Sequence, residues 1–272
     1  MSDESLSMGI LLDEPMMERW AAEAVAQSIR DADVSVELAL LSSDRDPDSR
    51  RSLRSYASSA LGTGAWAPVL GWHRLVRTPS YLQKVPIDEL DWFETADTHR
   101  LTPEPAEGIG QTLPAEGIDH IESAAIDVLF RRGFGILQGD VLTAPRYGVL
   151  SYHHGNIREY RGVPPGVWEF AYDETSAGIT LQRLNETLDG GEIVVEKDVR
   201  IDDLPTWQAV ERELFDRSTG MLATACQRLQ DPDFEPIQPD ELGQLYTNPG
   251  PLETARIELK NARGVLAHQL GR

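Results

Sequence analysis

Two adjacent histidines and a distant aspartate are the residues of this chain whose types and spacing most readily indicate chemistry. His153 and His154 end the apolar stretch GVLSYHH, and Asp189 precedes two glycines in LDGGE. An imidazole within reach of a carboxylate can act as a general acid or base near neutral pH. His153 can equally be a hydrogen-bonded core histidine, and Asp189 a turn residue of the Asp-Gly kind. The residues alone leave both interpretations open.

The elements that must position these residues are short apolar strands. We expect strands at residues 8–12, 34–41, 126–130, 148–153, 178–184 and 192–201. A helix is expected over 13–29, with Pro15 in its first turn. The predicted fold class is α/β, a doubly wound, Rossmann-like, mostly parallel sheet with helices on both faces. His153 then lies at the carboxyl edge of the sheet, where such folds bind ligands.

The rest of the chain is expected to support this core. Residues 43–82 are interpreted as helices and loops that bring Trp66 and Trp72 into the core, and the Pro- and Gly-rich residues 101–117 as a long loop. One amphipathic helix is expected from Pro205 to about Leu229, and another at 254–270. We therefore expect an α/β core at 1–204 and a helical appendage at 205–272 that packs on it.

The charge of the chain is strongly acidic. Forty-five acidic residues against 25 basic ones give a formal net charge of −20, and only three of the basic residues are lysines. A disordered acidic protein would lack the 40% apolar content and the six tryptophans found here. The acidic residues are dispersed along the whole chain, which instead favours a folded protein adapted to high salt. A broad nucleic-acid-binding face is not expected.

Cysteine content and hydropathy limit the metal sites, disulfides and membrane segments that the sequence can contain. Cys226 is the single cysteine, so a disulfide within the chain and a cysteine-rich zinc site are excluded, and we expect no metal. The acidic start MSDESLSMGILLDEP does not resemble a signal peptide, and no stretch is apolar enough for a membrane helix. We expect a soluble, cytoplasmic protein. The oligomeric state is not predicted.

The segment from Ile126 to Val195 resembles the folate-dependent formyltransferase family, which includes methionyl-tRNA, glycinamide ribonucleotide and amino-sugar formyltransferases. The family pattern is Asn-x-His, then Tyr-Arg-Gly, then a strand and Leu-Asp-x-Gly. Ser151, Tyr152 and His153 fall on the first motif and Tyr160-Arg161-Gly162 on the second. Leu188-Asp189-Gly190-Gly191 matches the third, and GITLQRL matches the strand before it. Both the order and the gaps agree.

The resemblance implies an enzyme with 10-formyltetrahydrofolate as co-substrate. His153 would protonate or hydrogen-bond the oxyanion, and Asp189 would orient the imidazole and hold a water that relays the proton of the amine. Phe134, Gly135, Ile136 and Leu137 would line the pterin pocket. His154, Asn156, Arg161 and Gly162 would belong to the substrate loop, where Arg161 supports the active-site loop.

Ser151 departs from the family at the third catalytic position. Asparagine there offers an amide N–H to the oxyanion, whereas the serine side chain is shorter. Loss of such a donor costs roughly a hundred- to a thousandfold in rate. His154 or Asn156 is our candidate for the replacement donor.

Arg131 and Arg132 are a second departure, because relatives have small apolar residues at these positions. Either arginine could anchor a carboxylate or phosphate, or be a solvated or ion-paired side chain.

The predicted reaction is formyl transfer to an amine of a small metabolite, with a nucleotide-linked amino sugar as the first candidate. Methionyl-tRNA is a less favoured acceptor, because the residues after Pro205 are expected to be helical and are not basic, whereas tRNA-acting members carry a C-terminal β-barrel. Hydrolysis of 10-formyltetrahydrofolate and an inactive folate- or nucleotide-binding homologue are the remaining alternatives.

Overall fold

A computed structural model of the chain describes residues 5–43, 66, 69, 71 and 78–270. Its centre is a seven-stranded sheet with the strand order β12-β11-β9-β8-β1-β3-β5. The strands are β1 (Leu6–Leu12), β3 (Val34–Ser42), β5 (Asp97–Leu101), β8 (Val128–Arg131), β9 (Val149–His153), β11 (Ser176–Arg183) and β12 (Glu192–Arg200). All neighbouring pairs from β9 to β5 are parallel, whereas β11 runs antiparallel to both β9 and β12. The predicted mostly parallel α/β sheet is confirmed.

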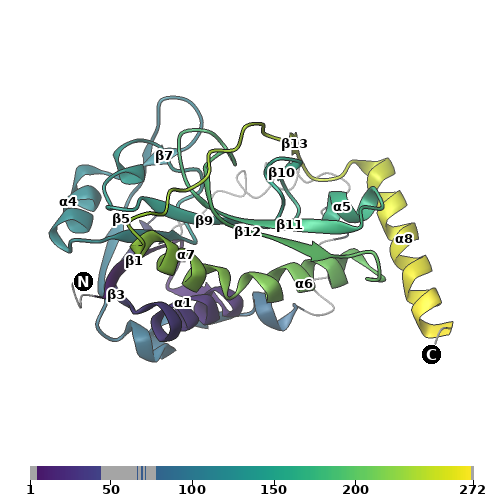
Figure 1. The fold of residues 1–272 in the computed structure, drawn as a ribbon, viewed down its shortest axis with the longest axis horizontal. Coiled ribbons are helices and arrows are strands. Elements are labelled where there is room, and N and C mark those ends of the chain that lie inside the picture. Colours follow the sequence, from purple (N-terminus) through teal and green to yellow (C-terminus); the bar gives the residue numbers. More distant parts are fainter. Residues whose placement is uncertain (1–4, 44–65, 67–68, 70, 72–77, 271–272) are drawn as a thin grey trace.

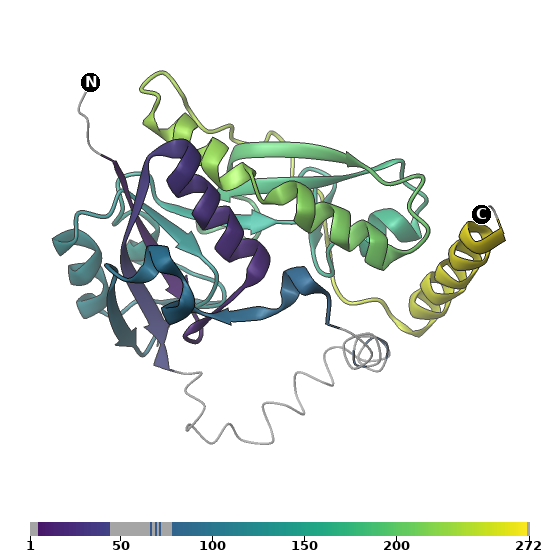
Figure 2. The same ribbon diagram turned by 90° about the horizontal axis from the view of Figure 1, so that it is seen from below.

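Helices cover both faces of this sheet (Figure 1). One face carries α1 (Arg19–Ala32), α6 (Trp207–Ser218) and α7 (Met221–Gln230), which lie side by side in Figure 2. The other face carries α4 (Ala115–Ser123) and the 3-10 turn η5 (Gly139–Leu142). The two faces have separate apolar clusters, because successive side chains of a strand point to opposite sides. Trp66 is fully buried against Trp207, as predicted, whereas Trp72 lies outside the described residues.

Smaller elements connect these layers. Short strands pair as β2 (Met16–Glu18) with β4 (Lys84–Pro86), β6 (Glu104–Pro105) with β7 (Gln111–Thr112), and β10 (Tyr160–Gly162) with β13 (Gln244–Tyr246). The remaining helical elements are η2 (Ser80–Leu82), η3 (Ile87–Glu89), η4 (Asp91–Phe93), α5 (Val167–Ala171) and α8 (Pro251–Leu270). The predicted long loop at 101–117 therefore contains β6 and β7 and the start of α4.

Two helix boundaries differ from the sequence prediction. The helix expected from residue 13 begins only at Arg19, because residues 16–18 pair with β4 as a strand, and Pro15 therefore precedes the helix. The single helix expected over 205–229 is divided into α6 and α7 at Thr219 and Gly220. Glycine weakens a helix interior, and the break lets α7 pack along α1.

The residues after 204 are not all peripheral. α6 and α7 pack on the sheet and on α1, and β13 pairs with β10. Only α8 projects from the end of the molecule (Figures 1 and 2). The apolar faces of α6 and α7 complete the main core.

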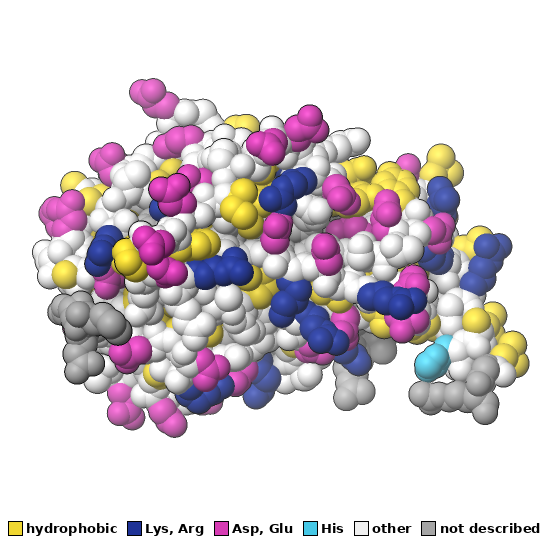
Figure 3. Space-filling view, viewed as in Figure 1, with side chains coloured by type: hydrophobic (Ala, Val, Ile, Leu, Met, Phe, Trp, Pro, Cys, Tyr) yellow, Lys and Arg dark blue, Asp and Glu magenta, His cyan; other side chains and the backbone are white. Residues whose placement is uncertain are grey.

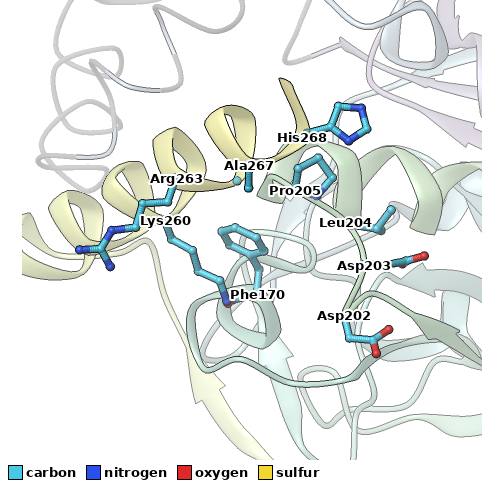
Figure 4. Close-up of a pocket in the computed structure, with 10 residues that line it drawn as sticks. Phe170, Asp202, Asp203, Leu204, Pro205, Lys260, Arg263, Ala267 and His268 are labelled. Atoms are coloured by element: carbon cyan, nitrogen blue, oxygen red, sulfur yellow. The ribbon is translucent and has the colours of Figure 1, made fainter. Parts of the chain in front are cut away.

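Helix α8 is attached to the core along one edge. The Lys260 ammonium lies 4.3 Å from the centroid of the Phe170 ring and also bonds to Asp173, and the Asn261 side-chain oxygen accepts a 3.0 Å hydrogen bond from Trp207 N. A cavity of about 610 Å³ separates α8 from the turn at Asp202–Pro205 (Figure 4). Asp202–Pro205 follow β12, which forms the edge of the sheet opposite β5.

Carboxylates are dispersed over the surface. Figure 3 shows Asp and Glu side chains scattered over the whole visible face, with Lys and Arg side chains between them. No described helix combines the length and hydropathy needed to span a bilayer.

Candidate active site

The carboxyl ends of β8 and β9 bring the candidate residues together. The two strands are parallel neighbours, with Phe130 opposite Leu150, so that Arg131 and Ser151 follow side by side. Side-chain alternation places Arg131, Ser151 and His153 on the face of the sheet that carries α4. Tyr152 and His154 lie on the opposite face, against Trp20.

His153 is held by groups on both of its ring nitrogens. Its Nε2 lies 2.9 Å from the carbonyl oxygen of Tyr160, and because a carbonyl only accepts, Nε2 carries the proton. Its Nδ1 lies 3.9 Å from Asp189 Oδ1, an ion-pair distance slightly longer than a hydrogen bond. The side chain is 9% exposed. The structure therefore brings the predicted His153 and Asp189 together.

The turn that carries Asp189 is fixed by its surroundings. Asp189 has a left-handed backbone with φ of 46°, and its Oδ2 accepts a 3.2 Å hydrogen bond from Gly162 N. Gly191 is required next to it, because a Cβ there would lie 2.3 Å from the carbonyl oxygen of Arg183. The LDGG motif is thus a tight turn that aims one carboxylate oxygen at His153.

The predicted support by Arg161 and Gly162 has a clear geometric basis. Arg161 donates to the carbonyl oxygens of Gly243 and Leu188, at 2.7 and 3.1 Å, and so connects the Asp189 turn to β10. Gly162 has a φ of 95° and donates directly to Asp189. Both residues act through the position of Asp189.

Arg131 occupies the space beside Ser151. Its Nη1 donates a 3.0 Å hydrogen bond to Ser151 Oγ, and its Nη2 donates to the carbonyl oxygen of Gly135. Burial lowers the pKa of Arg131, as does the neighbouring charge of Arg132, while Asp189 and Asp13 oppose this effect. The guanidinium is therefore a partly desolvated cation close to the Asp189 carboxylate.

A small cavity lies between these groups. It has a volume of about 70 Å³ and is lined by Arg131, Ile136, Leu137, Gln138, Ser151, Tyr152 and residues 184–189. At about 30 Å³ for a liquid water molecule, this is room for about two waters or for a formyl group. The cavity opens along Leu188, whose side chain is 40% exposed.

The four residues predicted to line the pterin pocket divide into two pairs. Ile136 and Leu137 line the cavity. The Phe134 side chain is fully buried in the apolar cluster of the α4 face, and its N–H donates to Asp13 Oδ1 at 2.7 Å. Gly135 offers its carbonyl to Arg131. Residues 134 and 135 thus shape the turn that holds Ile136 and Leu137.

The two candidates for a replacement donor lie elsewhere. His154 Nε2 lies 3.2 Å from Ser218 Oγ, and its ring packs on Trp20 and Phe215 on the α1 face. Burial holds the pKa of His154 well below its usual value, and the charges of Arg132 and His153 add to this effect. Asn156 uses its amide in its own turn, where it accepts from Arg158 N and donates to Glu159. The structure brings neither side chain to Ser151.

Sequence reasoning did not find the contact between Arg131 and Ser151 or the contribution of residues 184–187 to the cavity. Side-chain alternation places Arg131 and Ser151 on the same face of the sheet, so their contact could have been predicted if β8 and β9 had been known to be neighbours. Within the described part of the chain, no three His, Cys, Asp or Glu side chains are grouped so that they could hold a metal ion.

Comparison with known proteins gives a match over the segment that holds these residues. The family model described as formyl transferase matches residues 103–225, the segment that contains Arg131, Ser151, His153 and Asp189. This segment, which is less than half of the chain, is what resembles the formyl transferase family. The chain is similar to methionyl-tRNA formyltransferase of Thermotoga neapolitana, with 26% identity over 132 residues, 48% of this chain and 42% of that protein. It thus spans less than half the length of this curated relative.

Solved structures share the fold. Glycinamide ribonucleotide transformylase 1 from Symbiobacterium toebii superposes with a TM-score of 0.54 at 13% identity, covering 82% of this chain and 87% of that one. A likely sugar N-formyltransferase from Mycobacterium tuberculosis has a TM-score of 0.53 at 15% identity, covering 95% and 87%. At these identities the likeness concerns the fold.

Proposed function

We propose that this protein transfers a formyl group from 10-formyltetrahydrofolate to an amine of a small metabolite. The observation that carries the proposal is the convergence of His153 and Asp189 beside a cavity of formyl size, within the segment that matches the formyl transferase model. A carboxylate next to an imidazole suits an acyl transfer in which an amine must lose a proton.

The walls of the cavity fit a folate as the formyl donor. Ile136 and Leu188 offer apolar surface for the faces of a flat heterocycle, and the polar side chain of Gln138 also lines the cavity. The formyl group would enter the 70 Å³ cavity, and the ring system would lie against residues 136–138 and 184–188. The donor supplies the activated formyl carbon.

Asp189 and His153 would manage the proton of the acceptor amine. As the amine nitrogen bonds to the formyl carbon, its proton passes to Asp189 Oδ1, directly or through a water. A protonated His153, whose Nε2 already donates to Tyr160, would stabilise the ionised Asp189 before that transfer. Asp189 then passes the proton that it took from the amine to the donor nitrogen, as the bond between that nitrogen and the formyl carbon breaks. General acid–base catalysis of this kind contributes about a hundred- to ten-thousandfold in rate.

A nucleotide-linked amino sugar is the acceptor that we propose first. The Mycobacterium tuberculosis protein described as a likely sugar N-formyltransferase shares the fold over most of both chains. The Thermotoga neapolitana relative instead carries the name of a tRNA-modifying enzyme.

The test is a screen of amines with 10-formyltetrahydrofolate in molar salt, with release of tetrahydrofolate as the measurement. We expect release that depends on one class of amine, and a loss of about a hundredfold or more in kcat for His153→Ala and Asp189→Asn. Asp202→Asn, which removes an exposed carboxylate from the turn after β12, outside the candidate cavity, is the matched control. Formate released at the same rate without amine would indicate a hydrolase, and wild-type turnover by His153→Ala would refute the assignment of the site.

A further inference from the structure

The oxyanion that forms during formyl transfer needs a hydrogen-bond donor, and the Ser151 side chain is shorter than the asparagine of the family motif. The Ser151 hydroxyl accepts a 3.0 Å hydrogen bond from Arg131 Nη1, so the serine orients the guanidinium. His153 is also poorly placed to donate, because its Nε2 is bonded to the Tyr160 carbonyl and its Nδ1 faces Asp189. Arg131 is a further donor that lines the cavity.

Arg131 has donors to spare at this place. A guanidinium has five N–H groups, of which the described residues use one on Nη1 for Ser151 and one on Nη2 for Gly135. Within the described structure, the Arg131 Nε is buried and has no hydrogen-bond partner. The N–H groups of Arg131 that neither Ser151 nor Gly135 uses remain on Nη1, Nη2 and Nε.

The charge of Arg131 is also placed for this role. The side chain lines the 70 Å³ cavity together with Ser151 and Asp189. Its position at the last residue of β8 and its two hydrogen bonds hold it in place before any substrate binds. Donors that are already oriented at developing charge need no reorganisation in the transition state.

We propose that Arg131 is the oxyanion donor of this protein and that Ser151 holds its guanidinium in position. This inference rests on the proposed formyl transfer. As the amine nitrogen bonds to the formyl carbon, the carbonyl π pair moves to the formyl oxygen, and Arg131 donates hydrogen bonds to that oxyanion without giving up a proton. The oxygen pair then re-forms the carbonyl. The bond from the formyl carbon to the donor nitrogen breaks, and this nitrogen keeps the pair and takes the proton.

Arg132 provides a matched control. It is the adjacent arginine, but its Nη2 donates to Glu18 at 3.2 Å and its guanidinium lies 4.6 Å from the centroid of the Trp20 ring, on the α1 face. Replacing it removes the same charge from the same strand end without removing a group that lines the cavity.

The first experiment compares steady-state kinetics of the variants. We expect Arg131→Ala to lower kcat by about a hundred- to a thousandfold with little change in KM. Arg132→Ala is expected to keep kcat close to the wild-type value. Adding Ser151→Asn to Arg131→Ala should recover part of the lost kcat, because it restores the asparagine of the family motif together with a small residue at position 131. A change in KM alone would overturn the proposal, as would an unchanged kcat in folded Arg131→Ala.

A second experiment does not depend on turnover. Formate has the size and charge of the reacting group, so the wild-type protein should broaden the NMR line of ¹³C-formate, as should Arg132→Ala, whereas Arg131→Ala should not. Arg131→Lys, checked for folding by circular dichroism, keeps the charge but loses the planar fork and should broaden the line less than wild type. Equal broadening by wild type and Arg131→Ala would overturn the proposal. If no amine supports release of tetrahydrofolate, formyl transfer is refuted, and the formate measurement alone decides whether Arg131 is an anion donor.

Discussion

Substitution of Glu169 should make the stability of the protein less sensitive to alkaline pH. Glu169 lies in α5, is 3% exposed, and its Oε1 has no hydrogen-bond partner among the described residues. Burial raises the pKa of Glu169 from 4.5 to about 7, and the nearby carboxylates of Glu159 and Glu174 add to this rise. The folded protein therefore favours the neutral carboxyl group.

The sign and size of the effect follow from linkage. Because the folded-state pKa lies above the unfolded value, the stability associated with Glu169 is present below pH 4.5 and is lost as the pH rises to about 7. A difference of one in pKa corresponds to about 1.4 kcal/mol, so the complete loss is about 3 kcal/mol. Between about pH 5.5 and about pH 8.5 the expected loss is about 2 kcal/mol.

Glu169→Gln keeps the shape of the side chain and removes the ionisation. We expect the free energy of unfolding of the variant relative to wild type to rise by about 2 kcal/mol between the two pH values, measured by urea unfolding at constant molar salt. Comparing the two proteins at each pH cancels the titration of all other groups. A difference between the proteins that is the same at both pH values would refute the assignment of a neutral, buried Glu169.

Three further predictions concern packing. In Gly133→Ala, a Cβ would lie 2.3 Å from the backbone nitrogen of Asp13 and displace the turn that orients Arg131. We therefore expect the free energy of unfolding, measured in urea, to fall by about 3 kcal/mol and kcat to fall as well. An unchanged stability would contradict this packing. The Cys226 thiol is buried and its pKa is raised by desolvation to about 12, so a thiol reagent should modify it only after denaturation, and rapid modification of the native protein would be inconsistent with the fold. Tyr152→Phe should cost about 1 kcal/mol in the same unfolding assay, because the hydroxyl donates a 2.9 Å hydrogen bond to the carbonyl oxygen of Ser218, and a stabilised variant would argue against that bond.

The sequence was most informative where apolar residues are consecutive. β1, β3, β8, β9, β11 and β12 lie close to their predicted positions, because strands buried on both faces are apolar at nearly every residue. β5 was not predicted, since its sequence DTHRL is polar and it forms an edge of the sheet. The start of α1 was wrong by several residues, because residues 16–18 pair with a strand almost seventy positions later, which a local pattern does not contain.

The sequence predicted one contact of the candidate site and missed another. The contact between His153 and Asp189 followed from the order and gaps of three motifs. The relation between Arg131 and Ser151 depended on which strands are neighbours and in which register, and both are set by packing of the whole sheet. The direction of His154 depended on the same alternation, which turns neighbouring residues of β9 to opposite faces.

The pairing of β10 with β13 has a consequence for the smallest piece of the chain that can work. β10 supplies the Tyr160 carbonyl that holds His153 and the Gly162 N–H that holds Asp189, and its pairing partner lies at residues 244–246. The region matched by the family model ends earlier, at residue 225. A fragment cut at that limit would keep both side chains of the catalytic pair and β10, but would lose the strand that pairs with β10, so we expect a minimal active version of this protein to extend at least to Tyr246.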